Sequence, residues 1–316
     1  MKNVIFISPN FPENYWHFCH ELKENGMNVL GIGDCPYDDL RPELQESLQE
    51  YYKVDSLENY DEVYGAVGYF IWHYGRIDWL ESNNEYWLEQ DARLRTDFNI
   101  PSGFHNEDMP RIKYKSRMKE YYQRVGIPVA RYHMVDNYEG CLNFIHEVGY
   151  PVVAKPDNGV GASHTFKISF LMKNLAISSP TNGMIPFISW KNLSTLRSIP
   201  TMRSSTLTAI RFFEAGNVTP MSIMDIVNNA DNALFYIVKD LADDTRHLGR
   251  ETVKSFGVRS RFVHFEFFRL LSDHEGLGKK GDLMALEVNM RPSGGFTPDM
   301  INFARETDVY KIWADM

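Results

Sequence analysis

The sequence predicts an α/β domain followed by an α+β part. The first observation is near the start of the chain, where two apolar runs of strand length, Val4 to Ser8 and Val29 to Ile32, flank the helical pattern of Tyr15 to Lys23. Strand, helix and strand at this spacing form a βαβ unit, which implies parallel strands and a right-handed crossover. The second is near the end, where Phe262 to Leu271 and Leu283 to Met290 read as long strands joined by a charged turn.

Composition limits the class of protein. The chain has 316 residues, 43% of them hydrophobic and 24% charged, which is enough to bury one large or two smaller cores. A net charge of -9 disfavours nucleic acid or an anionic membrane as the main partner. Three scattered cysteines indicate neither a disulfide framework nor a zinc site, so we expect a cytoplasmic protein. No apolar run approaches the roughly 18 to 20 residues of a membrane span, and the first residues do not resemble a signal peptide.

The remainder of the first domain continues the α/β pattern. Tyr60 to Ile71 and Glu85 to Thr96 read as helices, and Ile77 to Leu80 lies between them as a strand. Residues 1 to about 100 are therefore predicted to form one small domain. Its first turn contains Pro9 and Pro12, which lack the amide donors that a pyrophosphate needs, so a dinucleotide-dependent oxidoreductase is disfavoured.

A lysine and glycines follow a buried strand in the middle of the chain. Two helices, Tyr114 to Arg124 and Tyr138 to Val148, precede a short buried strand predicted over Val152 to Pro156. Lys155 ends this strand, and a loop with Gly159 and Gly161 comes next, which is typical of a phosphate site. A flexible turn between two strands is the simpler alternative for this loop.

Polar residues alternate along the last strands. Glu287, Asn289 and Arg291 share one face of their strand, because side chains alternate in β structure. An antiparallel neighbour would place Glu266 beside Glu287, and two carboxylates with an amide oxygen suit Mg²⁺ that bridges nucleotide phosphates. Arg291 could then neutralise charge on a transferred phosphoryl group. An exposed polar face of an edge strand is the alternative.

In this order, the motifs resemble those of the ATP-grasp superfamily, which includes biotin carboxylase, D-alanine:D-alanine ligase and the carbamoyl phosphate synthase large chain. The resemblance covers roughly residues 1 to 168 and 214 to 316. Lys115, eleven residues before the Gly126-Ile127-Pro128 turn, matches the first phosphate-binding lysine of the family. Lys155 matches the second, with Gly159 and Gly161 in the phosphate-covering loop. The metal ligands of the family match three residues: Glu266 in an F-E-F strand, and Glu287 and Asn289 in an E-x-N-x-R strand that ends at Arg291.

The resemblance implies a Rossmann-like preATP-grasp domain (1 to 100) and a two-lobed ATP-grasp domain (101 to 316). The lobes would span about 110 to 185 and 186 to 316, and truncation at the C-terminus stays open. It further implies a ligase that uses ATP and Mg²⁺ (or Mn²⁺). Such an enzyme activates a carboxylate as an acylphosphate for attack by an amine, thiol or similar nucleophile. The partners would be these small molecules, without nucleic acid or membrane, and a homodimer is one assembly that it allows.

The sequence leaves the two substrates open. Asn83, Glu85 and Trp87 follow a predicted strand and are candidates to face the substrate, although surface positions at a helix start explain them equally well. None of the scattered histidines is assigned a catalytic role.

One segment does not fit the resemblance. Residues 158 to 213 contain no Asp or Glu, although 42 acids in 316 residues would place about seven there. The acidic E-x-[FLY] strand that holds adenine and ribose in the family is also missing. Codons for Ser189 to Leu193, read one base out of frame, can encode Met-Glu-Glu-Phe, so we expect a frameshift around residues 169 to 212, which should then pack poorly. A genuine insertion or divergent lobe is the alternative, and a catalytically defective nucleotide-binding homologue is the corresponding rival function.

Overall fold

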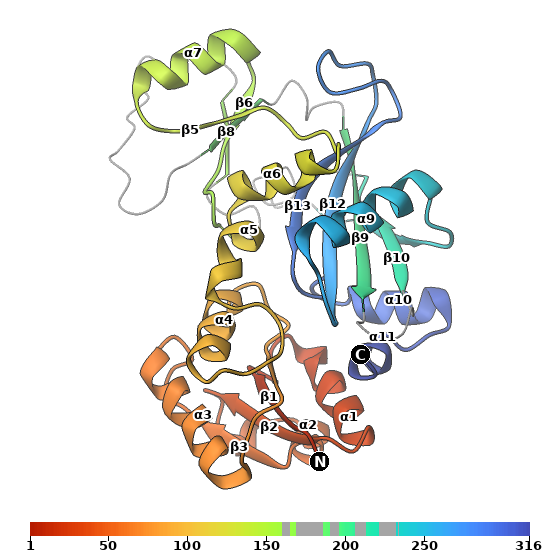
Figure 1. Ribbon diagram of the computed structural model, residues 1–316. Coiled ribbons are helices and arrows are strands. Elements are labelled where there is room, and N and C mark those ends of the chain that lie inside the picture. The colour runs from red at the N-terminus through yellow and green to blue at the C-terminus, as the bar shows by residue number, and fades with distance from the viewer. Residues whose placement is uncertain (160–164, 169–185, 190–195, 206–212, 221–231, 233) are drawn as a thin grey trace.

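The computed structural model describes the chain except for residues 160–164, 169–185, 190–195, 206–212, 221–231 and 233 (Figure 1). For residues 167, 186–189 and 196–205 the description is limited to the backbone. Within the described part, no helix is long and apolar enough to cross a membrane.

The first 100 residues form a parallel four-stranded sheet, which confirms the predicted α/β start. The strand order is β3-β2-β1-β4, and β1 pairs with both β2 and β4. The strands are β1 (Asn3–Ile7), β2 (Asn28–Gly33), β3 (Glu50–Lys53) and β4 (Trp79–Glu81). Strand β3 was not predicted, because its sequence Glu-Tyr-Tyr-Lys lacks an apolar run. The hydrogen bonds of its pairing with β2 stabilise the strand instead.

Helices cover both faces of this sheet. One face packs against α1 (Trp16–Glu24), α2 (Pro42–Ser47) and the C-terminal α11 (Val309–Ala314). The other face packs against α3 (Tyr60–Tyr74) and α4 (Leu88–Asp97). The C-terminal end of the chain therefore returns to the first sheet, and α10 (Thr297–Arg305) precedes α11 (Figure 1).

The second sheet is antiparallel, with the order β5-β8-β6-β7. Its strands are β5 (Tyr132–Met134), β6 (Val152–Ala154), β7 (Phe166–Ile168) and β8 (Pro186–Ser189). Helix α7 (Tyr138–Val148) packs on this sheet through Cys141, Ile145 and Val148. Asn137 caps α7 by accepting a hydrogen bond from the backbone N–H of Gly140 at 2.8 Å.

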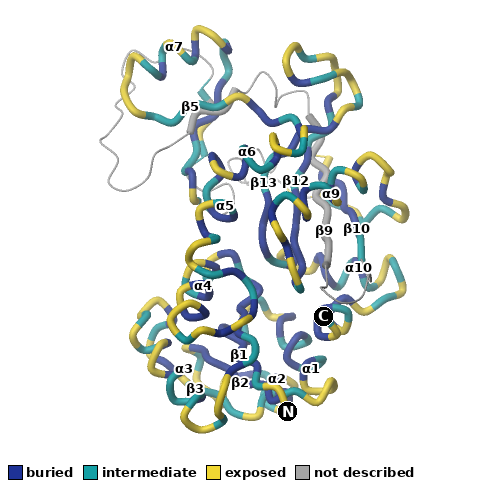
Figure 2. Tube along the Cα trace, in the orientation of Figure 1, coloured by how far each residue is buried: buried dark blue, intermediate teal, exposed yellow. Residues whose placement is uncertain are grey.

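The third sheet carries the long strands near the C-terminus, in the order β11-β10-β9-β12-β13. Its strands are β9 (Leu196–Ser205), β10 (Glu214–Val218), β11 (Tyr236–Val238), β12 (Arg261–Leu270) and β13 (Leu283–Asn289). Helix α9 (Asp243–Phe256) covers one face. Figure 2 shows β12 and β13 buried along most of their length.

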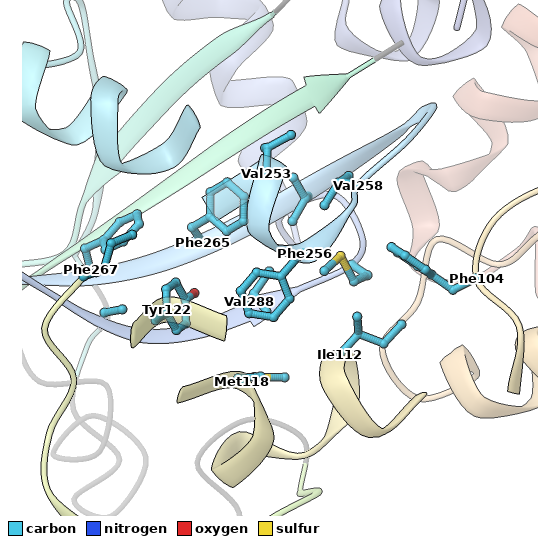
Figure 3. Close-up of a cluster of buried hydrophobic side chains, with 14 of the residues drawn as sticks. Phe104, Ile112, Met118, Tyr122, Val253, Phe256, Val258, Phe265, Phe267 and Val288 are labelled. Carbon is cyan, nitrogen blue, oxygen red and sulfur yellow. The ribbon is translucent and has the colours of Figure 1, made fainter. Parts of the chain in front are cut away.

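The largest apolar core joins this third sheet to two helices from the middle of the chain. Phe265 and Phe267 of β12 and Val288 of β13 point toward Tyr122 and the α9 residue Phe256 (Figure 3). Tyr122 belongs to α6 (Lys115–Arg124), which follows α5 (Met109–Lys113). Because side chains alternate along a strand, burial of these apolar residues turns the residues between them toward the opposite face.

Short elements complete the description. They are the 3-10 helices Glu13–Tyr15, Tyr37–Asp39 and Asn106–Asp108. Helix α4 begins at Leu88, three residues later than the predicted Glu85. Asn83 has a left-handed φ of 55°, which is incompatible with a helix, and so residues 82 to 87 form a connection at the end of β4.

Candidate active site

Glu266 and Glu287 lie directly opposite one another on β12 and β13. The antiparallel register pairs Glu266 with Glu287 and His264 with Asn289, as the sequence pattern predicts for neighbouring strands. A register shift after Glu266 marks a bulge at this position. The side-chain amide of Asn289 donates to Glu287 Oε1 at 3.5 Å. Three oxygen-bearing side chains therefore gather in this one part of the sheet.

Lys115, the first residue of α6, reaches the same carboxylate. Its Nζ lies 3.6 Å from Glu287 Oε2 and donates a hydrogen bond to the carbonyl of Gly159 at 2.6 Å. The Lys115 side chain is only 8% exposed, so water screens this ion pair weakly. Gly159 is thus placed beside Lys115, whereas Gly161 lies outside the described residues.

Asp157 joins the loop after Lys155 to the start of α6. Its two carboxylate oxygens accept hydrogen bonds from the backbone N–H and the hydroxyl of Ser116, both at 2.7 Å. Its carbonyl accepts from the backbone N–H of Lys115 at 2.9 Å. An anion at a helix N-terminus satisfies unpaired amides and favours the helix dipole. This contact ties the loop of Lys155 to the helix that carries Lys115.

Lys155 interacts electrostatically with Lys115, Glu266 and Glu287. Burial lowers its pKa to about 8, and the nearby charge of Lys115 adds to this effect, whereas Glu287 and Glu266 oppose it. Two lysines 40 positions apart in sequence are therefore brought to the same two carboxylates. Their mutual repulsion is a cost that a bound anion would remove.

The two glutamates have opposite protonation tendencies. Burial and the charge of Glu287 raise the pKa of Glu266 to about 8, so Glu266 holds a proton at neutral pH. Burial also acts to raise the pKa of Glu287, but Lys115 and Lys155 outweigh it and hold this pKa below its usual range. The free protein thus carries one proton that a divalent cation would have to displace.

Arg291 lies beside the connection after β4. Its Nε is 3.7 Å from Glu85 Oε2, and Lys113 Nζ is 3.7 Å from Glu85 Oε1. Both distances exceed those of good hydrogen bonds, and Glu85 Oε2 has no hydrogen-bond partner among the described residues. Burial raises the pKa of Glu85. Glu85 is therefore a buried carboxylate held loosely between two cations.

The other two candidates after β4 are placed differently. Asn83 is buried, and its side-chain Nδ2 has no hydrogen-bond partner within the described chain. Its carbonyl accepts a hydrogen bond from the Tyr15 hydroxyl at 2.7 Å. Trp87 packs against the core between the first sheet and helices α3 and α4. Of the three, Glu85 has the contact with Arg291.

Three residues near this site were not assigned from the sequence: Lys113, Asp157 and His264. His264 is buried beside Asn289, and neither ring nitrogen has a partner in the described part of the chain. Burial, with a smaller contribution from Arg291, lowers its pKa to about 3, so the ring is neutral. The sequence could have indicated His264, which lies two residues before Glu266 on the same strand face. It could not have indicated Lys113 and Asp157, because their positions in the site depend on contacts with distant segments.

The donor set is compatible with Mg²⁺. Among the described residues there is no cluster of three or more His, Cys, Asp or Glu side chains able to hold a metal ion by themselves. The set of two carboxylates and an amide is smaller, and Mg²⁺ commonly binds one or two carboxylates while phosphate and water supply the rest. The proton on Glu266 and the pairing of Glu287 with Lys115 are consistent with a site that a cation completes.

Part of the anomalous segment lies in the described backbone. Residues 186–189 form β8, which pairs with β5 and β6, and residues 196–205 form β9, which pairs with β10 and β12. The rest of residues 169 to 212, including the position of the missing acidic motif, lies outside the described residues. The frameshift therefore stays a prediction.

Comparisons with known proteins point to one fold. No family model matches the chain. The carbamoyl phosphate synthase large chain of Thermus thermophilus is 25% identical over 166 residues, which are 48% of this chain and only 15% of that relative.

Solved structures match over nearly the whole chain. The L-amino acid ligase of Bacillus licheniformis has a TM-score of 0.69 at 17% identity and covers 96% of this chain and 70% of its own. The phosphoribosylglycinamide synthetase of Anaerococcus prevotii has a TM-score of 0.68 at 16% identity, covering 99% and 74%. The biotin carboxylase domain of the 2-oxoglutarate carboxylase of Hydrogenobacter thermophilus, a dimer in complex with MgADP and bicarbonate, has a TM-score of 0.72 at 16% identity, covering 99% and 68%. The chain therefore has the fold of the ATP-grasp superfamily that its motifs resemble.

Proposed function

We propose that this protein is an ATP-dependent ligase that activates a carboxylate as an acylphosphate for attack by an amine or a similar nucleophile. The observation that carries the proposal is the meeting of Lys115 and Lys155 with the strand-paired Glu266 and Glu287. Lys115 is buried, and Lys155, Glu266 and Glu287 are partly buried. Two cations beside two carboxylates, with this little exposure, suit a phosphate chain and its metal better than they suit an apolar core.

The residues divide into three roles. Glu266, Glu287 and Asn289 would hold Mg²⁺, which when bound supplies positive charge to the phosphates. Lys115 and Lys155 would bind the phosphate oxygens, with the backbone of Gly159 close to Lys115. Arg291 would stabilise the charge that develops as the carboxylate attacks the γ-phosphoryl group. Most of the catalysis would thus come from positioning and charge neutralisation.

The carboxylate substrate would bind near Arg291 and Lys113. Both cations lie 3.7 Å from the carboxylate oxygens of Glu85, beyond hydrogen-bond distance, although Lys113 Nζ also donates to the Glu85 carbonyl at 3.1 Å. An incoming carboxylate can therefore compete with the Glu85 carboxylate for them. Glu85 and the unpartnered amide of Asn83 would then be available to the rest of the substrate. Small-molecule partners and a cytoplasmic location follow from the same proposal.

Carboxylate-dependent ADP release tests the function. The protein would be incubated with Mg-ATP, hydroxylamine and a panel of amino acids and other carboxylates, because hydroxylamine traps an acylphosphate as a hydroxamate. We expect ADP and hydroxamate in equal amounts with particular carboxylates. Glu287→Gln should lower the rate by about 100-fold or more, in the range of other lost charge-stabilising groups. Glu147→Gln, at a side chain that is 68% exposed, is the matched control.

The rival function gives a different result. A catalytically defective homologue would bind Mg-ATP, with weaker binding in Glu287→Gln, but would release no ADP with any carboxylate. Absence of Mg-ATP binding by the wild-type protein would overturn both readings of the site.

A further inference from the structure

Helix α3 carries apolar residues on its outer side as well as on its buried side. Val63, Ala66, Val67 and Phe70 face the first sheet and are fully buried. From Val63 to Tyr74 the helix contains no Asp, Glu, Lys or Arg. A long helix stretch without Asp, Glu, Lys or Arg is normally covered on both sides, yet α3 lies at the outside of the first sheet (Figures 1 and 2).

The outer side forms a continuous surface, which we call the α3 surface: Tyr64, Gly65, Gly68 and Trp72. These residues follow the three- and four-residue spacing of one helix face. Trp72 is 80% exposed and Tyr64 is 42% exposed. No atom lies within 4 Å of a Cβ built at Gly65 or Gly68, so the two glycines leave a shallow gap between the aromatic side chains. Exposed aromatic residues of this kind are enriched in protein interfaces.

Unpaired charges of opposite sign lie at the two ends of the α3 surface. Asp61 is exposed in the first turn of the helix, and Arg76 is exposed just after Gly75 ends it. Neither side chain has a hydrogen bond or ion pair with the described residues. Glu62, in contrast, is occupied, because it accepts hydrogen bonds from the backbone N–H groups of Asp55 and Ser56.

We propose that the α3 surface is the contact between two copies of this chain, with the two α3 helices antiparallel about a twofold axis at Gly68. In a twofold contact, residue i meets residue j and j meets i, so the positions must be symmetric in sequence along the helix. Tyr64 and Trp72 are each four residues from Gly68, so each Tyr64 faces the Trp72 of the partner. Asp61 and Arg76 lie seven and eight residues from it, so each Asp61 comes near the partner's Arg76.

This arrangement explains why two glycines lie between the two large aromatic residues of the α3 surface. Each Trp72 would cover the gap beside the partner's glycines, where the backbones can approach closely. Alignment of the N-terminal end of one helix with the C-terminal end of the other is also favourable for the helix dipoles. One helix pair buries less area than a standard interface, so we expect a dissociation constant of roughly 1 to 100 µM.

Sedimentation analysis of the whole protein between about 1 and 200 µM, a range chosen to bracket this constant, tests the proposal. Wild type should shift from monomer to dimer with concentration, and Trp72→Glu should stay monomeric. Phe303→Glu is the matched control, because Phe303 is 88% exposed on α10 and should leave the dimer intact. A wild type that stays monomeric, or a dimer that survives Trp72→Glu, overturns the proposal.

Two further experiments test the geometry of the contact. Gly68→Cys should form a disulfide between two copies under mild oxidation, whereas Phe303→Cys should not, both in a Cys35→Ser background. Asp61→Arg and Arg76→Asp should each weaken the dimer, and the double variant should restore it. Crosslinking at Phe303 and not at Gly68, or failure of the double variant to recover affinity, would show that the helices do not pair in this way. None of these measurements needs ATP or a substrate, so their outcome is separate from that of the ligase proposal.

Discussion

Replacement of Arg261 should destabilise the protein far more than loss of a surface arginine. Arg261, at the start of β12, shares the carboxylate of Glu81 with Arg95, and Arg95 Nη2 lies 2.9 Å from Glu81 Oε2. Arg261 Nη1 also donates to the carbonyl of Met290 at 2.8 Å. All three charged side chains are at most 4% exposed. The cluster thus joins the end of β4 to the backbone just before Arg291.

The magnitude follows from burial. Arg261→Met keeps much of the side-chain volume but leaves Glu81 with one cation instead of two and leaves the Met290 carbonyl without this donor. Removal of one partner from a buried ion pair costs about 3 to 5 kcal/mol in the free energy of unfolding. The exposed pair of Arg131 and Glu147, at 3.2 Å, should contribute less than about 1 kcal/mol, so Arg131→Met is the matched control.

Urea unfolding followed by circular dichroism measures both variants, with the slope of the transition as a check on two-state behaviour. Glu81→Gln should also destabilise the protein, and the double variant Glu81→Gln with Arg261→Met should lose less than the sum of the two single losses, because the partners interact directly. An Arg261→Met protein within about 1 kcal/mol of wild type would refute this reasoning. Additive losses in the double variant would show that the pair is not coupled.

Three other outcomes can be measured. Because the pKa of Glu266 is raised to about 8, Mg²⁺ binding at pH 7 should release up to one proton and should tighten as the pH rises toward 8. Calorimetry in two buffers of different ionisation enthalpy detects the released proton. Binding without proton release would exclude Glu266 as a ligand. Because the pKa of Lys155 is lowered to about 8, nucleotide binding should take up a proton above pH 8 and weaken as pH rises, and Lys155→Gln should abolish this uptake. Gly103→Ala should destabilise the protein, because Gly103 has a φ of +66° and a Cβ there would lie 2.7 Å from Arg95 Cζ. Gly126→Ala is the control, because Gly126 also has a positive φ but has open space around its Cβ position.

The motifs predicted the pairing of the two polar strands of the candidate site because they combine strand spacing with residue chemistry. Glu266 sits in an aromatic strand and Glu287 in an alternating one, so an antiparallel pairing of the two was the simplest expectation, and the register has it. The same reasoning missed Asp157 and Lys113. An Asp that caps a helix 41 residues away leaves no local pattern, and neither does a lysine that reaches Glu85 from another segment.

Local sequence also misjudged the connection after β4. The spacing of apolar residues predicted a helix from Glu85. The left-handed backbone at Asn83, and the hydrogen bond that the N–H of Tyr86 donates to Asn84 Oδ1, delay the helix start to Leu88. This delay leaves Glu85 in a connecting segment, where its carboxylate comes near Arg291. The helix itself was predicted correctly, but the turn after β4 moves its start.

The sequence by itself determined the parallel sheet of the first domain, the strands of the polar site and the identities of the residues on them, because periods of two and 3.6 residues are written along the chain. Only the tertiary structure decided which distant groups meet. The carboxylate of Glu81 forms ion pairs with Arg95 and Arg261. The loop that follows Lys155 contacts α6 through the hydrogen bond from the Ser116 N–H to Asp157. The tertiary structure also decides protonation. Glu266 and Glu287 are the same residue type on paired strands, yet their pKa values diverge. Lys115 and Lys155 favour ionisation of Glu287, whereas burial beside the charge of Glu287 keeps Glu266 protonated. Burial and the field of neighbouring charges are properties of the packed chain, and no local pattern encodes them.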